Sequence, residues 1–206
     1  NTNKFKVIQD NASFTDIASN ASSAMDIRGN ITVTTPSGDW KKSEANKKVT
    51  FTSYGTGIST AYVFIYSPDD STEYQLDGGS GVATAGTGNS QDMNVSSVPD
   101  AKSNSCIIRV RDTYLKASAK IEAQSGTFKA YPVISNVAIT ATNPPNVSGV
   151  WVAGSTNQTV TWSVNGSSQI DAVNIYYSST GVGGFTTPIM PNWNTQQGTC
   201  GTITVP

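Results

Sequence analysis

The chain has 206 residues, enough for one large domain or two ordinary ones. Hydrophobic residues make up 36% of it, charged residues only 13%, and Ser and Thr together about a quarter, a composition that excludes a disordered chain and favours an extracellular β protein. A net charge of -1 gives no electrostatic reason to expect nucleic acid or an anionic membrane as a partner, and no apolar run is long enough to span a bilayer.

Short runs of alternating Val, Ile, Tyr and Thr, separated by Gly, Asn, Ser and Pro, predict β-strands throughout the chain. In chain order, the predicted strands are 5–9, 24–29, 31–36, 49–54, 61–67, 73–76, 93–98, 106–112, 127–131, 137–142, 159–164, 172–178 and 202–205. Between them, the Gly-rich segment 77–92 is expected to be an inserted loop, and so is 115–126, despite some helical propensity.

An internal repeat organises these strands. "ITVTTPSGDW" (31–40) is echoed by "ITATNPPNVSGVW" (139–151), "KKVTFTSYG" (47–55) by "QTVTWSVNG" (158–166), and "AYVFIYSP" (61–68) by "AVNIYYSS" (172–179). The matches place Ile31 on Ile139, Phe51 on Trp162, and Ile65 on Tyr176. Several patches in the same order, about 110 residues apart, indicate a duplicated domain.

The N-terminal segment resembles the other end of the same repeat. Phe5 and Val7 match Ile108 and Val110, so residues 1–29 are predicted to be the last two strands of a preceding or neighbouring sandwich. A complete sandwich is then predicted over 30–132 and the first part of a second over 133–206. After "TVP" at the end, we expect a segment like the one at the start, and the lack of an initial Met fits a processed chain or a part of a longer one.

The strand motifs also carry a resemblance to known domains. The pattern combines "ITVTTP" (31–36), "VTF" (49–51) or "VTW" (160–162), "VFIYS" (63–67) and "IRVRD" (108–112). It resembles the immunoglobulin-like domain of fungal cell-wall glucan-assembly and Ser/Thr-rich surface proteins, and the tandem repeats of very long prokaryotic surface proteins. The resemblance implies antiparallel sandwiches of about seven strands and a cell-surface location, but no chemistry.

An incomplete sandwich leaves an open hydrophobic face and unpaired sheet edges. Either the chain is one part of a covalent tandem array, or its N-terminal segment inserts into the incomplete sandwich of another copy, with Phe5 and Val7 entering the core. Both arrangements run head to tail. We therefore expect a structural subunit or repeat of an extracellular filament, sheath or surface layer, whose partners are copies of itself.

Candidate catalytic chemistry is sparse. The absence of His excludes Ser-His-Asp triads and imidazole metal sites. The acidic group Asp69, Asp70 and Asp77 lacks the spacing of a calcium loop and is predicted to be a solvated turn. Two carboxylate pairs have no spacing that forces proximity: Glu73 with Asp77, and Glu44 with Glu122. We expect no catalytic residue, no cofactor, no metal and no enzyme activity.

Two arginines stand out in the strand 106–112. Alternation puts Arg109 and Arg111 on its outward face, where pairing with Asp or Glu is the ordinary explanation.

Aromatic residues leave an alternative function open. A sugar-stacking platform could be built from Trp151, Trp162, Tyr176, Tyr177 and Trp193. By alternation Trp162 is a core residue, so Trp193 is the best candidate for an exposed ring. The alternative is a carbohydrate-binding or adhesive module with cell-surface glycan as partner.

Two kinds of modification are also predicted. Of the Asn-x-Ser/Thr sequences, Asn11, Asn20, Asn157 and Asn165 are the best glycosylation candidates, because they lie beside strand ends or in loops. Strand direction places both cysteines, Cys106 and Cys200, at the joint between the two sandwiches. An interdomain disulfide is expected, with an intersubunit bridge or two separate thiols as alternatives.

Overall fold

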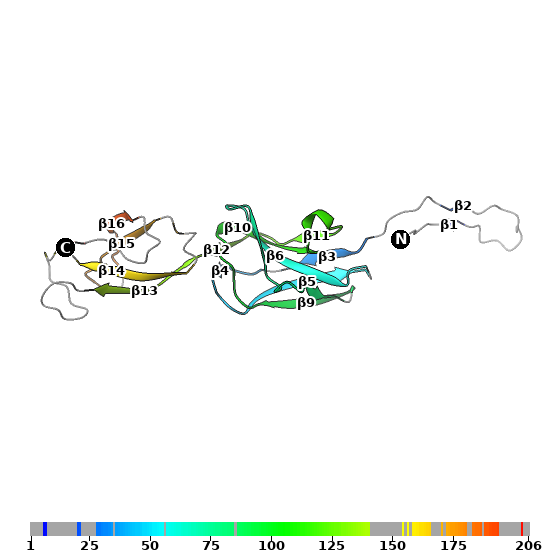
Figure 1. Cartoon of the computed structure of the whole chain (residues 1–206), viewed down its shortest axis with the longest axis horizontal. Coiled ribbons are helices and arrows are strands. Elements are labelled where there is room, and N and C mark those ends of the chain that lie inside the picture. The colour runs from blue at the N-terminus through cyan, green and yellow to red at the C-terminus, as the bar shows by residue number, and fades with distance from the viewer. Residues whose placement is uncertain are drawn as a thin grey trace, which may run out of the picture.

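The computed structural model describes residues 6–7, 20–21, 28–34, 36–55, 57–84, 86–140, 154, 156, 158–165, 170, 172–180, 183–186, 188–193 and 203 (Figure 1). The described part is all-β, and its one helical element is a 3-10 turn, η1 (Lys116–Ser118). The strands are β1 (Lys6–Val7), β2 (Asn20–Ala21), β3 (Asn30–Val33), β4 (Trp40–Lys41), β5 (Lys47–Tyr54), β6 (Thr60–Ser67), β7 (Thr72–Gln75), β8 (Val82–Ala83), β9 (Thr87–Val95), β10 (Ser103–Arg111), β11 (Glu122–Gln124), β12 (Phe128–Tyr131), β13 (Val133–Thr140), β14 (Thr159–Asn165), β15 (Val173–Tyr176) and β16 (Pro188–Trp193).

Strands β3 to β12 form a central β-sandwich. One sheet has the order β3-β5-β9, and the other has the order β4-β12-β10-β6-β7, with β11 added beside β10 and β8 beside β6. The pairs are antiparallel except for β12 with β4, which is parallel. Figure 1 shows the two sheets face to face, with β3 at one end of the sandwich and β12 at the other.

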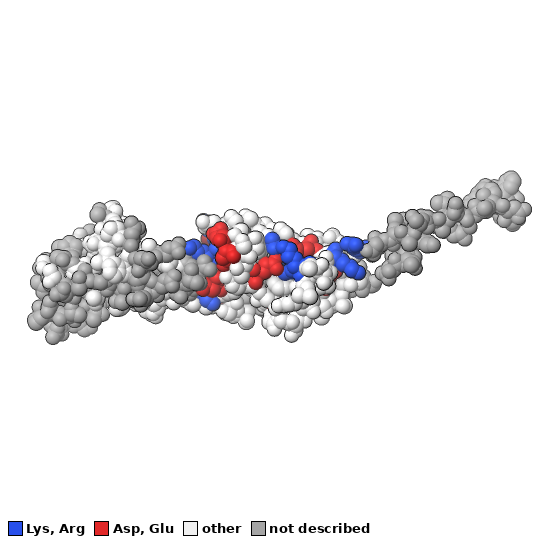
Figure 2. Space-filling view, turned by 45° about the horizontal axis from the view of Figure 1, so that its top comes forward, with Lys and Arg blue, Asp and Glu red and all other residues white. Residues whose placement is uncertain are grey.

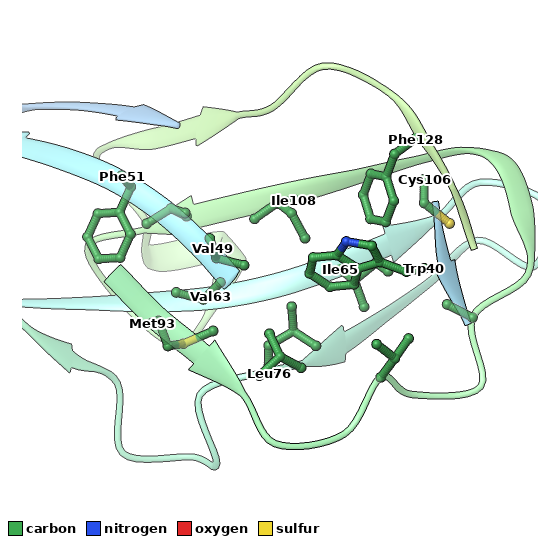
Figure 3. Close-up of a cluster of buried hydrophobic side chains, with 14 of the residues drawn as sticks. Trp40, Val49, Phe51, Val63, Ile65, Leu76, Met93, Cys106, Ile108 and Phe128 are labelled. Atoms are coloured by element: carbon green, nitrogen blue, oxygen red, sulfur yellow. The ribbon is translucent and has the colours of Figure 1, made fainter. Parts of the chain in front are cut away.

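Alternating side chains of the long strands fill the space between the sheets (Figure 3). On β5, Val49 and Phe51 are fully buried, and on β6 and β10 the inward residues include Ile65 and Ile108. At the β12 end, the rings of Trp40 and Phe128 pack with centroids 5.0 Å apart. Each such side chain contributes about 1.5–3 kcal/mol when buried, so this core makes the central sandwich the most strongly stabilised part of the described chain.

A second, smaller β unit follows the central sandwich directly, because only Pro132 separates β12 from β13. It contains two antiparallel pairs, β13 with β14 and β15 with β16. Its buried cluster consists of Val160, Trp162 and Ile203. The exposed fraction of Trp162 is 8%, which confirms its prediction as a core residue.

The N-terminal segment contributes a two-stranded antiparallel ribbon. Lys6 lies opposite Ala21 and Val7 opposite Asn20. Figure 1 shows the β1–β2 ribbon apart from the central sandwich, beyond the start of β3. The predicted strand 5–9 is observed at 6–7, whereas most of the predicted strand 24–29 lies outside the described residues, and Arg28 and Gly29 are not in a strand.

The sequence patterns missed several short or irregular elements. Strands β2, β4, β8, β11 and β16 have no predicted counterpart. The expected loop 77–92 instead contains β8 and residues 87–92 of β9, and β9 pairs with β5 as far as Tyr54 opposite Thr87. The glycines of this segment let the chain turn sharply between strands, as at Gly81 with a φ of 72°. The expected loop 115–126 contains η1 and β11.

Candidate functional site

The second β unit contains an open apolar groove of about 490 Å³. Residues from all four of its strands line this groove. Many of these side chains are strongly exposed: Ile134 45%, Val137 67%, Ile139 41%, Tyr176 41% and Tyr177 46%. Monomeric proteins rarely expose such a contiguous apolar surface, so the groove is the strongest candidate for a binding site.

Charge is nearly absent around this groove. From Pro132 to Pro206 the sequence contains one charged residue, Asp171. In Figure 2 the described Lys, Arg, Asp and Glu residues (blue and red) lie on the central sandwich, and the described surface of the second unit is white. A partner of the groove would therefore be recognised through apolar contacts and uncharged hydrogen bonds.

The predicted repeat matches β15 of the second unit to β6 of the central sandwich, and β16 to β7. In the central sandwich, β6 is paired on both edges, with β10 on one side and β7 on the other. Among the described residues, the strand paired with β15 is β16.

The burial pattern of β15 corrects the sequence match of this strand by one residue. Val173 and Ile175 pack against the buried cluster of the second unit, whereas Tyr176 is exposed. In β6, the core cluster between the sheets contains Val63 and Ile65 but not Phe64. Within the predicted repeat, this alternation matches Val63 to Val173 and Ile65 to Ile175 instead of Tyr176. A one-residue slip moves every side chain to the other face of a strand.

A second correction concerns β13. Ile31 lies opposite Ser53 in the central sandwich, and Val164, the repeat equivalent of Ser53, lies opposite Ile134. Within the predicted repeat, these pairings match Ile31 to Ile134 instead of Ile139.

The N-terminal ribbon repeats the ladder of β10 with β11. Arg109 lies opposite Gln124 and Val110 opposite Ala123, just as Lys6 lies opposite Ala21 and Val7 opposite Asn20. With Val7 on Val110, as the sequence match has it, both ladders have the same register. Phe5 lies outside the described residues, and the side chain of Val7 is not described.

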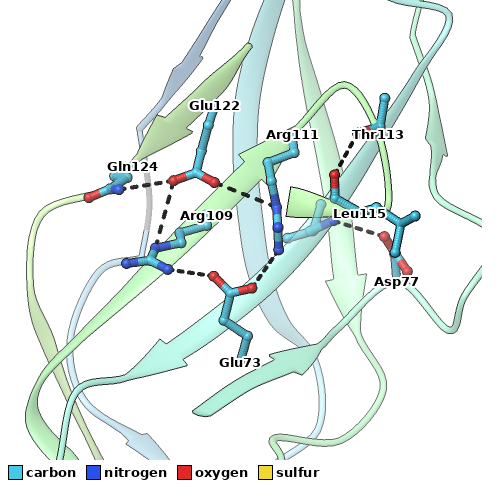
Figure 4. Close-up of polar contacts among 9 residues, drawn as sticks. Glu73, Asp77, Arg109, Arg111, Thr113, Leu115, Glu122 and Gln124 are labelled. Carbon is cyan, nitrogen blue, oxygen red and sulfur yellow. Dashed lines mark hydrogen bonds and ion pairs between the residues drawn. The ribbon is translucent and has the colours of Figure 1, made fainter. Parts of the chain in front are cut away.

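Arg109 and Arg111 belong to a polar cluster on the outer face of the central sandwich (Figure 4). Both donate to the Glu73 carboxylate, Arg111 at 2.7 Å, and Glu122 lies 3.6 Å from Arg111 Nε. This confirms the predicted pairing with acidic residues.

Aromatic rings cover this cluster. The guanidinium carbons lie 3.9 Å from the ring centre of Tyr66 for Arg109 and 4.0 Å from that of Phe64 for Arg111. Burial alone would raise the pKa of Glu73, but the hydrogen bonds and charges of the two arginines outweigh it and hold that pKa below its usual range. With both carboxylates committed to arginines, the cluster stabilises the sheet and offers no free acid or base.

The other acidic candidates accept hydrogen bonds that hold turns and a neighbouring strand in place. Asp77 accepts hydrogen bonds from the backbone N–H groups of Val63 at 2.8 Å and Gly79 at 3.0 Å. Asp70 accepts from Tyr74 Oη at 2.9 Å; burial and this carboxylate raise the pKa of Tyr74 to about 12. The part of the chain that the structure describes contains no group of three or more potential metal ligands of the His, Cys, Asp and Glu types.

Glu44 has a similar local role. It accepts a hydrogen bond from Lys41 N at 3.0 Å and pairs with Lys47 at 3.1 Å. The backbone bond is the main reason that the pKa of Glu44 lies below its usual value.

Cys106 is a fully buried thiol at the start of β10. It lies opposite Phe128 of β12, at the end of the sandwich next to β13, as strand direction predicted. Burial raises its pKa to about 11. The structure has Cys106 as a free thiol and so does not show the expected bridge; the other cysteine of that prediction, Cys200, lies outside the described residues.

Of the sugar-stacking candidates, Trp162, Tyr176 and Tyr177 line the groove. Trp193, expected to be the exposed ring, is instead partly buried and packs against the second cluster, and Trp151 lies outside the described residues. Asn165 is exposed at the end of β14, where its Oδ1 accepts a hydrogen bond from Ser43 Oγ of the central sandwich at 3.4 Å. Asn20 lies in β2, and Asn11 and Asn157 lie outside the described residues.

No protein-family model matches this chain, and no curated protein sequence is significantly similar to it. Within the described ranges, no helix has the length and hydropathy to cross a membrane.

Proposed function

We propose that this chain is a structural subunit of an extracellular filament, sheath or surface layer, built from immunoglobulin-like repeats. In this proposal copies join head to tail: the N-terminal segment of one copy supplies strands that complete the second β unit of the next. The observation that carries the proposal is the open apolar groove of the second unit, which side chains from β13, β14, β15 and β16 line.

The predicted repeat indicates which segment occupies the groove. The β1–β2 ribbon has the ladder of β10 with β11, and β10 is the strand that closes the central sandwich. Burial of Phe5 and Val7 in the groove would contribute about 1.5–3 kcal/mol each, and pairing with a strand of the second unit would add backbone hydrogen bonds. Within one chain, the ribbon and the second unit lie at opposite ends of the central sandwich (Figure 1), so one copy can join two neighbours.

Such a contact uses different surfaces on the two partners. A heterologous contact generates an open filament unless its rotation closes a ring. If the parent protein is a covalent tandem array, the equivalent strands of the following repeat occupy the same groove. The contact between consecutive repeats then has the same structure as the contact between separate copies. The Ser/Thr-rich, charge-poor composition supports a cell-surface location.

A carbohydrate-binding or adhesive module is the second proposal. The exposed rings of Tyr176 and Tyr177 favour it, since aromatic faces stack on sugars. Because both rings line the groove, strand insertion and sugar binding would compete. Binding to a glycan array that persists in assembled material would favour this second function.

Electron microscopy of the purified chain tests the main proposal. Filaments or rings are expected for the full chain, and deletion of residues 1–10 is expected to abolish them. Two variants separate the groove contact from general effects. Phe5→Ser with Val7→Ser should prevent assembly. Lys6→Ser should not, because successive residues of a strand lie on opposite faces and Lys6 is not on the face of Phe5 and Val7. Normal polymers from the truncated chain would show that the proposal is wrong.

A further inference from the structure

Strand β9 is the outermost strand of its sheet in the central sandwich. Among the described residues it pairs with β5 alone, in the sheet order β3-β5-β9. It is nine residues long, whereas β3 and β7, the outermost strands elsewhere in the sandwich, have four residues each. A long strand edge with unpaired backbone groups is a template for pairing with another strand.

The side chains of β9 do not protect this edge. Edge strands are commonly protected by Lys, Pro or other charged residues, and β7 follows this rule with Glu73 in the strand. The sequence of β9, "TGNSQDMNV", has no Lys, Arg or Pro. Its single acidic residue, Asp92, pairs with Lys48 at 3.0 Å and accepts a hydrogen bond from Thr50 Oγ1 at 2.6 Å, both within the same sheet.

The backbone groups of β9 alternate between its two edges, as in any strand. Val95 O accepts from Asn46 N at 3.1 Å, on the side of β5. The odd-numbered residues from Gln91 to Val95 therefore bond to β5. In agreement, Thr50, which stands opposite the even-numbered position 92, turns its carbonyl to the other side and accepts from Thr34 N at 3.0 Å. The even-numbered residues thus direct their N–H and C=O groups to the outer edge: Ser90, Asp92 and Asn94.

We propose that β9 of one chain pairs antiparallel with β9 of a second copy, with the two Gln91 residues facing each other across a two-fold axis. The two three-stranded sheets then form one continuous sheet in the order β3-β5-β9-β9-β5-β3. This contact joins central sandwiches side by side. It goes beyond the head-to-tail contact of the proposed function and does not depend on it.

The register follows from symmetry and charge. Because the outward backbone groups stand at even positions, they pair with each other only if the axis passes through a residue. An axis at Asp92 would place two carboxylates directly opposite each other, which is destabilising. An axis at Met93 would overlap only residues 91–95. An axis at Gln91 overlaps the whole of β9 and places Ser90 of each copy opposite Asp92 of the other, where the hydroxyl can donate to the carboxylate.

An unpaired amide of Gln91 independently points to the same axis. Gln91 Oε1 is buried and has no hydrogen-bond partner in the part of the chain that the structure describes. A buried acceptor left unpaired costs free energy. In the proposed register the two Gln91 residues form a non-hydrogen-bonded pair, the type whose side chains lie closest. Since an amide contains both donors and an acceptor, each Gln91 can donate to the Oε1 of the other.

The position of β9 leaves room for both contacts. In Figure 1, β9 runs along the side of the central sandwich, whereas the β1–β2 ribbon and the second unit lie beyond its two ends. Head-to-tail joints and β9 pairs therefore use different surfaces. Used together, they would join filaments laterally into a ribbon or layer.

Cysteine cross-linking of the full-length chain tests the contact and its register. Gln91→Cys is made together with Cys200→Ser, and the chain is oxidised mildly. Cys106 can stay, because it is fully buried and its pKa is raised to about 11. The two Cα atoms at position 91 would be about 4.5 Å apart, within reach of a disulfide. Most of the chain should shift to a covalent dimer on a non-reducing gel.

Asp92→Cys and Asn94→Cys, in the same background, are the matched controls. Two copies of position 92 would be diagonal neighbours about 7–8 Å apart, and those of position 94 would be farther apart, so both should cross-link poorly. Stronger cross-linking at 92 or 94 than at 91 would overturn the proposal.

A second pair of variants tests the backbone pairing without cysteine. Ser90→Pro removes an N–H that points to the outer edge and leaves the hydrogen bonds of β9 to β5 in place. Ser90→Thr keeps both the N–H and a hydroxyl. In sedimentation velocity, side-by-side association should be lost in Ser90→Pro and kept in Ser90→Thr, with near-ultraviolet circular dichroism to verify that both variants fold.

The outcomes separate this contact from the proposed function. Single filaments without a cross-link at position 91 would overturn the β9 pairing and leave the head-to-tail proposal standing. A cross-linked dimer at position 91 from a chain that forms no filaments or rings would support the β9 pairing and count against the head-to-tail proposal.

Discussion

Replacing Glu73 by Gln tests the buried arginines of the central sandwich. The Glu73 carboxylate accepts hydrogen bonds from Arg109 and Arg111, and the Arg111 side chain is only 1% exposed. Breaking a buried ion pair costs about 3–5 kcal/mol, because it leaves a charge without its partner. The cost should fall below this range here, since Glu122 still faces Arg111 and 22% of the Glu73 side chain is exposed. We expect Glu73→Gln to lower the free energy of unfolding by about 2–3 kcal/mol.

Urea unfolding followed by tryptophan fluorescence measures this loss, since urea, unlike guanidinium, does not screen ion pairs. The lowered pKa of Glu73 sets the sign of the pH dependence. Its ion pair stabilises the fold above the ordinary pKa of 4.5, and that contribution is lost as the pH falls through the lower folded value. The gap between wild type and variant should therefore close in acid. Glu44→Gln, at an exposed pair, is the control. A loss below about 0.5 kcal/mol at neutral pH, within the range of ordinary surface substitutions, would refute the reasoning.

Three further predictions concern the core, the thiol and assembly. Trp40→Ala should cost about 3–5 kcal/mol in urea unfolding, because the ring is 1% exposed and packs on Phe128; a loss below 1.5 kcal/mol would contradict this. Cys106 should resist maleimide in the native chain and react in urea, as mass spectrometry of peptides can show; labelling of the folded protein would argue against a buried thiol. Light scattering should show assembly little affected by sodium chloride and promoted by sulfate, since the second unit carries almost no charge.

Strict alternation is what made the main strands predictable. In β5, β6 and β10, apolar residues at every second position face a core on one side only, so pattern and structure agree at Val49, Phe51, Ile108 and Val110. Strand β16 was missed because it contains Pro188 and Pro191, which count against a strand in any sequence pattern although an edge strand tolerates them.

The groove was predictable in kind but not in detail. The repeat predicts an incomplete second sandwich. In "AVNIYYS" (172–178), however, apolar or aromatic residues stand at both odd and even positions. Alternation therefore cannot tell which face of that strand is buried, and the match to β6 slipped by one residue. Only the packing of Val173 and Ile175 on Trp162 resolves it. The arginine pairing was expected, but the near-complete burial of Arg111 was not, because it depends on rings from a neighbouring strand.

The single residue between β12 and β13 has a mechanical consequence. The chain enters the central sandwich at Asn30 on β3 and leaves it at Tyr131 on β12, at opposite ends of the fold. Pro132 allows little slack between the two units. A pull on the two ends of the chain would therefore load β3 and β12 lengthwise against β5 and β10. The backbone hydrogen bonds of each ladder would then resist the force together in shear instead of opening one after another.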